Sequence, residues 1–195
     1  MLGPVVLEGS LVRLEPLTLD HHAALCEVGL DPELWRWIPT TIRTPDDLRR
    51  YIDKALGEQA AGTSLPFAII ERASGRAIGS TRYMNIAAEH RRLEIGATWL
   101  GRPWQRSGCN TECKLLLLSH AFEVLGYQRV ELKTDVLNAQ SRAAILRLGA
   151  KEEGVFRKHV IRDTGASRDT VYFSILDDEW PAVKAKLERT PKPSN

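Results

Sequence analysis

The sequence predicts a mixed α/β fold built as one domain. Short stretches in which apolar and polar residues alternate, as in half-buried strands, stand between longer stretches whose apolar residues follow a helical period. The chain has 195 residues, of which 43% are hydrophobic and 27% charged, the composition of a soluble globular protein with a sizeable core. We expect a single domain over residues 1–185 and a flexible tail over 186–195, where Pro and Ser gather.

Two helices are predicted between the first strand and a hairpin. The stretch Thr44-Pro45-Asp46-Asp47 is a strong helix start, because a capping residue precedes Pro at the first helical position and acids follow in the first turn. A Gly-containing turn between two apolar runs predicts the hairpin. In order, this half contains a strand over 11–15, a helix from 18 or 20 to 29, a helix from 44 to 62, and strands over 67–71 and 77–83.

The centre of the chain is a strand over 93–100, a turn over 101–110 and a long helix over 111–125. Leu115, Leu118 and Phe122 belong to a wide apolar stripe on that helix, which predicts burial against a sheet, and Gly126 is placed to end it. The remaining predicted elements are a strand over 129–136, a helix over 138–148 closed by a glycine, an antiparallel pair over 153–161 and 168–176, and a helical segment after residue 180.

Charge and cysteine content exclude several classes of protein. A net charge of +2, spread along the chain, argues against direct binding of nucleic acid or membrane, and no apolar run reaches the roughly 20 residues of a membrane span. Residues 1–20 carry no secretory pattern, and three cysteines indicate a reducing compartment, so we expect a cytoplasmic protein. Cys109 and Cys113 share a helix face but lack further ligands, so no metal site is predicted.

The turn Gln105–Asn110 lies where a strand hands over to a helix N-terminus. The first amides of a helix have no partner inside it, and the helix dipole favours anions there, so such a loop can bind phosphate. Gly108 would allow close approach of a ligand to the backbone. On these residues alone, a tight turn without a ligand is an equal alternative. The loop matches neither a P-loop nor a dinucleotide fingerprint.

The pattern Gln-x-x-Gly-x-small, following Leu93-Glu94-Ile95-Gly96, resembles the acetyl-CoA loop of the GNAT N-acetyltransferases. The resemblance extends from about Leu11 to Trp180 and is greatest to the branch of ribosomal-protein-alanine N-acetyltransferases. It implies a central, mostly antiparallel, twisted sheet flanked by helices, with acetyl-CoA as cofactor and no metal. Asn110 stands where many members have Gly or Ala, and its role as helix cap or cofactor contact is open.

The resemblance implies a general base, because an ammonium cannot attack a thioester until it loses a proton. Glu94 stands at the position of this base, and the alternative is a salt bridge to Arg92 or Arg82. Trp35 and Trp37 flank the implied acceptor cleft, so with Glu94 they are the predicted acceptor contacts, against the alternative of core packing. Strand alternation predicts that Glu94, Gly96, Thr98 and Leu100 share one face, and Leu93, Ile95, Ala97 and Trp99 the other.

The acid that protonates the departing thiolate is commonly a Tyr in this family, but Ile145 occupies that position here. Ser141 is the substitute that the ribosomal-protein branch suggests, and Asn138 accompanies it near the cofactor. A helix cap followed by a solvent-facing serine is the alternative. The resemblance places acetyl-CoA against Trp99, Leu100, Gln105, Arg106, Ser107, Gly108, Cys109, Asn110, Thr111, Asn138 and Ser141.

The sequence therefore predicts an acetyl-CoA-dependent N-acetyltransferase that acts by direct transfer in a ternary complex. The expected acceptor is the N-terminal amine of a protein, such as a ribosomal protein. Two alternatives stay open: an acetyltransferase for a small amine (an antibiotic, a polyamine or an amino acid), and a non-catalytic acyl-CoA-binding module, which Ile145 would suit. A homodimer is compatible with the sequence.

Overall fold

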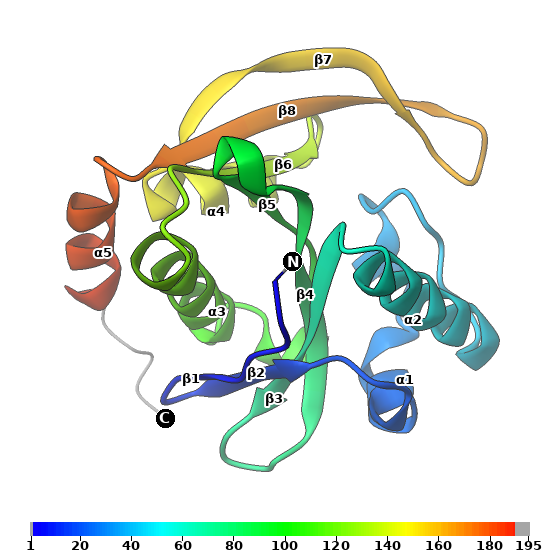
Figure 1. Ribbon diagram of the computed structural model, residues 1–195. Coiled ribbons are helices and arrows are strands. Elements are labelled where there is room, and N and C mark those ends of the chain that lie inside the picture. Colours follow the sequence, from blue (N-terminus) through cyan, green and yellow to red (C-terminus); the bar gives the residue numbers. More distant parts are fainter. Residues whose placement is uncertain (1, 190–195) are drawn as a thin grey trace.

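The computed structural model describes residues 2–189, which form one eight-stranded sheet (Figure 1). The strand order is β1-β2-β3-β4-β5-β6-β8-β7, and every neighbouring pair is antiparallel except β5 and β6, which are parallel. The strands are β1 Leu7–Glu8, β2 Val12–Pro16, β3 Ser64–Glu71, β4 Ala77–Ala87, β5 Arg92–Leu100, β6 Arg129–Asp135, β7 Lys151–Ile161 and β8 Ser167–Leu176. The predicted mixed α/β fold is confirmed, and β1 is an addition to the predicted strands.

Helices cover both faces of this sheet, and each layer encloses its own apolar core. Helices α3, α4 and α5 cover one face and enclose the larger core, whereas α1 and α2 cover the other face and enclose the smaller core (Figure 1). The helices are α1 His22–Gly29, α2 Pro45–Ala60, α3 Cys109–Ser119, α4 Ala139–Leu148 and α5 Trp180–Arg189, and short turns lie at Leu19–His21, Pro32–Trp35, Ala88–His90 and Arg102–Trp104. A π-helical turn, His120–Val124, continues α3.

Local sequence signals account for the ends of the helices near the centre of the chain. Thr44 caps α2 by accepting a hydrogen bond from the amide of Asp47, as its Thr-Pro start predicts. Gly149 ends α4 at a φ of 108°, a conformation that glycine adopts with little strain. At the C-terminus, α5 runs to Arg189 and buries Leu187, so residues 186–189 of the predicted tail are helical, and residues 190–195 lie outside the described residues.

Strand β5 contains a bulge at Ala97, whose φ is 48°. Opposite it on β4, Ser80 pairs with Trp99 and Arg82 with Gly96, so one residue of β4 faces two of β5. The extra residue reverses the alternation: Leu93 and Ile95 lie in the larger core, whereas Trp99 lies in the smaller one. The predicted face sharing therefore fails beyond Ile95, because the bulge shifts the period by one residue.

Strands β5 and β6 separate soon after they meet. Their pairing covers only Arg92–Glu94 with Arg129–Glu131, although β6 remains paired with β8 along its whole length. Beyond Glu94, the edge of β5 that faces β6 has no neighbouring strand. This point of separation, which we call the fork, combines a bulge with open backbone groups, the features of a sheet that receives a ligand. Within residues 2–189, no helix is long and apolar enough to cross a membrane.

Candidate active site

The sheet face that α1 and α2 only partly cover is polar near the fork. Buried polar groups normally find hydrogen-bond partners, so a group of unpaired ones indicates a place where a ligand or water binds. On this face, several buried side-chain atoms of the described chain have no hydrogen-bond partner, although one of them, Arg168 Nε, lies 3.8 Å from the Asp135 carboxylate. They are Ser80 Oγ, Arg82 Nε, Glu94 Oε1, Trp99 Nε1, Arg168 Nε and Thr170 Oγ1.

Glu94 is fully buried at the fork. Its Oε2 accepts a hydrogen bond from Asn85 Nδ2 at 2.8 Å and lies 2.9 Å from Lys133 Nζ, while Oε1 has no partner. A Cβ at Gly96 would lie 2.7 Å from both Oε1 and Met84 Sδ, so only a glycine fits beside this oxygen. One oxygen of the carboxylate is therefore held by two partners, and the other is buried without a hydrogen-bond partner.

Glu94 forms an ion pair, but with neither Arg92 nor Arg82, the two partners considered from the sequence. Arg82 pairs with Glu58 on α2 at 3.0 Å, and Arg92 lies 3.8 Å from Glu131, so neither arginine neutralises Glu94. The partner is Lys133 on β6, whose strand alternation places it on the same face. Burial alone would lower the pKa of Lys133, but the adjacent Glu94 carboxylate holds that pKa above its ordinary value.

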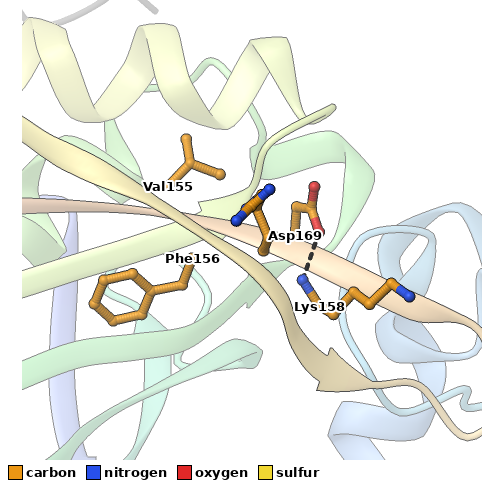
Figure 2. A pocket seen from close by; sticks show the side chains of 5 residues that line it. Val155, Phe156, Lys158 and Asp169 are labelled. Carbon is orange, nitrogen blue, oxygen red and sulfur yellow. Dashed lines mark hydrogen bonds between the residues drawn. The ribbon is translucent and has the colours of Figure 1, made fainter.

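An aromatic cluster adjoins this ion pair. Lys133 Nζ lies 5.6 Å from the centre of the Tyr172 ring, and that ring lies 4.7 Å from Phe156 and 5.5 Å from His159. Phe156 is 53% exposed although it is large and apolar. Figure 2 shows Phe156 and Val155 on opposite sides of β7, at a surface hollow beside the bond from the Lys158 amide to Asp169. The cluster offers an apolar surface close to Glu94.

The tip of the β7–β8 hairpin is attached to the loop between α1 and α2. Arg168 donates to the carbonyl of Trp37 at 3.1 Å, and the Asp163 amide donates to the carbonyl of Pro39 at 3.1 Å. Arg162 bonds both Asp135 and the carbonyl of Arg36. Arg162, Asp163 and Arg168 of the hairpin thus bond three carbonyls of the loop between α1 and α2. These bonds hold the loop beside the polar face.

The two tryptophans of this loop have different surroundings. Trp35 is buried in the smaller core, where its ring lies 5.3 Å from those of Tyr51 and Trp99 and its Nε1 donates to the carbonyl of Gly29. Core packing therefore describes Trp35. Trp37 is half-buried beside the hairpin, and its contact with an acceptor stays a prediction.

The loop before α3 has the backbone geometry of an anion site. Arg106 and Gly108 both have positive φ, 61° and 88°, with Ser107 between them, and α3 begins at Cys109. Alternating backbone conformations of this kind turn successive amides towards one point, and here that point is also a helix N-terminus. Gln105 Nε2 donates to the carbonyl of Leu100, which ties the loop to the end of β5.

Asn110 does not cap α3, because Gly108 is the N-cap residue and lacks a side chain. The Asn110 Oδ1 is instead buried without a partner. Neither neighbouring cysteine is prepared as a nucleophile, because burial raises the pKa of both Cys109 and Cys113. Glu112 accepts hydrogen bonds from Ser10 and the following amides, and the described residues contain no group of three or more potential metal ligands.

Asn138 and Ser141 lie at the N-terminus of α4, beyond the end of β6. Asn138 Oδ1 accepts from the amide of Ser141 at 3.0 Å, so the capping role is present. Ser141 is half-buried, and Arg142 beside it bonds Glu152 at 3.2 Å. The two segments that would bind opposite ends of a long cofactor, the α3 loop and the α4 start, therefore follow the two strands of the fork.

Sequence reasoning missed the partners of Glu94. Lys133, Tyr172 and Asn85 come from three other strands, and only the pairing order of the sheet brings them together. The charged side of β6 was one available signal: Arg129, Glu131, Lys133 and Asp135 alternate with apolar residues in what proves to be an interior strand.

Comparisons with known proteins agree with this geometry. The GNAT acetyltransferase domain family matches residues 12–151. A crystal structure from T. thermophilus, assigned as a candidate acetyltransferase, is 40% identical with a TM-score of 0.87 and covers 96% of this chain and 97% of that chain. RimJ of Mycobacterium smegmatis, solved with CoA-disulfide, is 25% identical with a TM-score of 0.79, covering 95% and 92% of the two chains.

Among curated relatives, YdaF of Bacillus subtilis (strain 168) is named as a candidate ribosomal N-acetyltransferase. It is 34% identical over 110 residues, which is 56% of this chain and 59% of YdaF. The match of the family domain to most of the chain, together with the fork, the bulge and the loop before α3, settles the assignment. The chain belongs to the GNAT family of acetyltransferases.

Proposed function

We propose that this enzyme transfers the acetyl group of acetyl-CoA to the N-terminal amine of a protein, by direct attack within a ternary complex. The observation that carries the proposal is the unpaired Oε1 of Glu94 at the fork. A buried carboxylate with one free oxygen can accept a proton from an ammonium group that approaches from the polar face. The other oxygen, held by Asn85 and Lys133, fixes its orientation.

The residues around the fork fit acetyl-CoA. The amides from Arg106 to Gly108, and that of Asn110 at the start of α3, suit a pyrophosphate, and Gly108 leaves room for its close approach. Asn110 Oδ1, buried and unpaired, offers an acceptor to a ligand in this loop. At the other end, the half-buried stretch from Gly96 to Thr98 follows the last β5–β6 pair, so the backbone there is available to the pantetheine arm.

Acetyl-CoA supplies a thioester whose carbonyl carbon the amine attacks, so that a C–N bond forms and the C–S bond breaks. Glu94 accepts the proton that the amine loses, directly or through a water molecule. Backbone amides near Trp99 and Leu100 stabilise the negative charge on the carbonyl oxygen, a contribution often worth about 3 kcal/mol. Ser141 donates a proton to the departing sulfur and regains one from solvent.

The acceptor assignment rests on relatives and on the exposed aromatic cluster. YdaF is named as a candidate ribosomal N-acetyltransferase. RimJ was solved in complex with a coenzyme A derivative. In this chain, the cluster of Phe156, His159 and Tyr172 gives the first side chain of a peptide an apolar surface near Glu94. A protein N-terminus has such a side chain beside its amine, whereas a polyamine does not.

The test is release of free thiol from acetyl-CoA in the presence of single acceptors. One panel contains peptides that begin with Ala, Ser or Met, and the other contains polyamines, amino acids and aminoglycosides. We expect release with peptides and a mass increase of one acetyl group at their N-termini. Release only with small amines would overturn the acceptor assignment. Binding of acetyl-CoA without release for any amine would favour a non-catalytic acyl-CoA-binding module.

A further inference from the structure

Lys114 on α3 is a buried lysine in the apolar layer between α3 and the sheet. It is 6% exposed and lies among residues of the larger core, including Cys113, Leu117 and Leu118. Its Nζ donates to Thr98 Oγ1 at 2.7 Å, and Thr98 Oγ1 lies 2.8 Å from Thr81 Oγ1 on β4. Thr98 directly follows the bulge residue Ala97. The ammonium group therefore lies at the point where β5 changes its alternation.

The charge of this lysine is not balanced by a nearby carboxylate. None of the ion pairs formed within residues 2–189 includes Lys114, and a lysine has three donors where one threonine hydroxyl is its hydrogen-bond partner. The titratable groups that act on its charge are Cys113, whose pKa burial raises, and Glu94, which lies on the opposite face of the sheet, while Thr81 and Thr98 do not titrate. Burial also lowers the pKa of Lys114, to about 8.

A buried ammonium without a carboxylate partner is unfavourable for folding, so apolar packing does not explain the presence of Lys114. Its position in the fold suggests another reason. Helix α3 begins at the anion loop and reaches Thr98 within its second turn, so Lys114 connects the loop to the open stretch of β5. On the other side of the sheet, Tyr51 OH contacts the carbonyl of Ala97 at 3.4 Å. The bulge is thus held from both layers.

We propose that Lys114 is a positioning residue for acetyl transfer, which fixes the β5 bulge through Thr98 and places a positive charge beside the thioester. Negative charge that develops on the thioester oxygen is stabilised by a fixed cation in a water-poor environment. The proposal rests on the placement of acetyl-CoA along β5 in the proposed function. It assigns the protonated state of Lys114 to the active enzyme.

The test compares the wild-type enzyme with Lys114→Met, which keeps the length and apolar stem of the side chain. The exposed Lys54→Met on α2 is the control for loss of a lysine. We expect Lys114→Met to lower kcat roughly 10- to 100-fold at pH 7, as loss of one oxyanion donor does, while KM for acetyl-CoA changes less than threefold. The ratio of the two kcat values, wild type over variant, should fall as pH rises through about 8.

The pH dependence of this ratio distinguishes charge from shape, because titration of the acceptor amine is common to both enzymes. A ratio that stays constant from pH 6 to 10 would mean a structural contact only, and a ratio of one would remove any role. Thr98→Val, compared with Thr98→Ser, keeps the proposal testable if Lys114→Met does not fold. Valine should reproduce the loss, and serine, which retains the hydroxyl, should restore most of kcat.

Failure of the acceptor assignment leaves this test intact. If no amine of the panels accepts the acetyl group, the same ratio is measured on the slow hydrolysis of acetyl-CoA, in which water takes the place of the amine. A pH-dependent ratio there would support the role of Lys114 while the proposed acceptor fails. Turnover with peptides and a pH-independent ratio would support the acceptor and overturn the role of Lys114.

Discussion

The two faces of the sheet obey different rules. Towards α3, α4 and α5, residues such as Leu93, Val130 and Phe173 are buried against apolar helix side chains, as the hydrophobic effect requires. Towards α1 and α2, the strands beside the fork carry Glu94, Lys133 and Arg168, and two polar atoms of these residues, Glu94 Oε1 and Arg168 Nε, are buried without a hydrogen bond. The first face holds the larger apolar core, which stabilises the fold. The second includes groups that oppose it, which is what a binding site contains.

The largest expected effect is on the polar face. Glu94→Gln keeps the size of the side chain and its acceptor for Asn85 but removes the base. We expect kcat to fall roughly 100-fold or more, within the range for loss of a general base. The urea midpoint should fall as well, because Lys133 loses its ion-pair partner, but the variant should remain folded under the assay conditions. Thiol-release kinetics and urea denaturation measured on the same preparation give both quantities. The exposed Glu89→Gln is the matched control and should behave as wild type.

The contrast between the faces would break if Glu94→Gln lowered stability and left turnover intact. Glu94 would then act as the structural partner of Lys133, and the polar face would be a second, ion-paired core. We also expect the variant to bind acetyl-CoA with wild-type affinity, as measured by calorimetry. The anion loop follows the end of β5, whereas Glu94 lies near the start of that strand.

The next effect belongs to the apolar face. Leu117 is fully buried between α3 and the sheet. We expect Leu117→Ala to lower the free energy of unfolding by about 3 kcal/mol, because it removes buried methyl groups and leaves a cavity. Its kcat per folded molecule should stay near that of wild type. Leu146→Ala on α4, where the leucine is 48% exposed, should change stability by less than about 0.5 kcal/mol.

Sequence patterns predicted one face better than the other. The helical stripe of α3 and the alternation of β6 state which side is apolar, and the caps at Thr44 and Gly149 mark helix ends, because these signals are local. Glu94 was predicted from the family resemblance, at the start of the strand that precedes the anion loop. The bulge at Ala97 was missed, because a small residue of neutral polarity does not disturb an alternating pattern.

The surroundings of Glu94 could not be predicted from local patterns. Lys133 and Tyr172 lie near Glu94 because β6 and β8 are the next two strands of the sheet after β5. Strand β8 lies between β6 and β7, although it follows β7 in the sequence. The attachment of Asp163 to Thr41 and Pro39 spans more than a hundred residues of sequence, and no periodicity indicates it. Long-range pairing of this kind depends on the whole fold. The sequence can therefore indicate a single residue of the polar face without indicating its partners.

A third prediction concerns Lys114, which lies in the apolar layer but carries a charge. Its folded pKa of about 8 is below the value of roughly 10.4 in an unfolded chain. Between these values the unfolded chain holds the proton and the folded one has released it, so this lysine makes stability rise with pH. Lys114→Met should be the more stable protein at pH 7, by at most about 3 kcal/mol, and that excess should shrink towards pH 10.

Urea denaturation of both proteins at pH 7 and pH 10 measures this excess, and Lys54→Met shows the effect of an exposed lysine. A constant difference between wild type and Lys114→Met would mean that the lysine titrates normally in the folded state. The buried charge would then be balanced in the folded protein, contrary to the contacts of Lys114. The apolar face would in that case hold no uncompensated charge, and the contrast between the two faces would be sharper.

The smallest expected effect is at the exposed edge of the polar face. Phe156 packs on Tyr172, is half-exposed and contributes little to either core, so Phe156→Ala should leave stability within about 1 kcal/mol of wild type. If the cluster receives the first side chain of a peptide, KM for a peptide that begins with Met should rise roughly 3- to 10-fold, the range of one aromatic contact. KM for acetyl-CoA should not change. Peptides that begin with Gly have no such side chain, so an equal rise in their KM would mean that Phe156 contacts the backbone of the acceptor. The polar face would then bind an amine without selecting the side chain beside it.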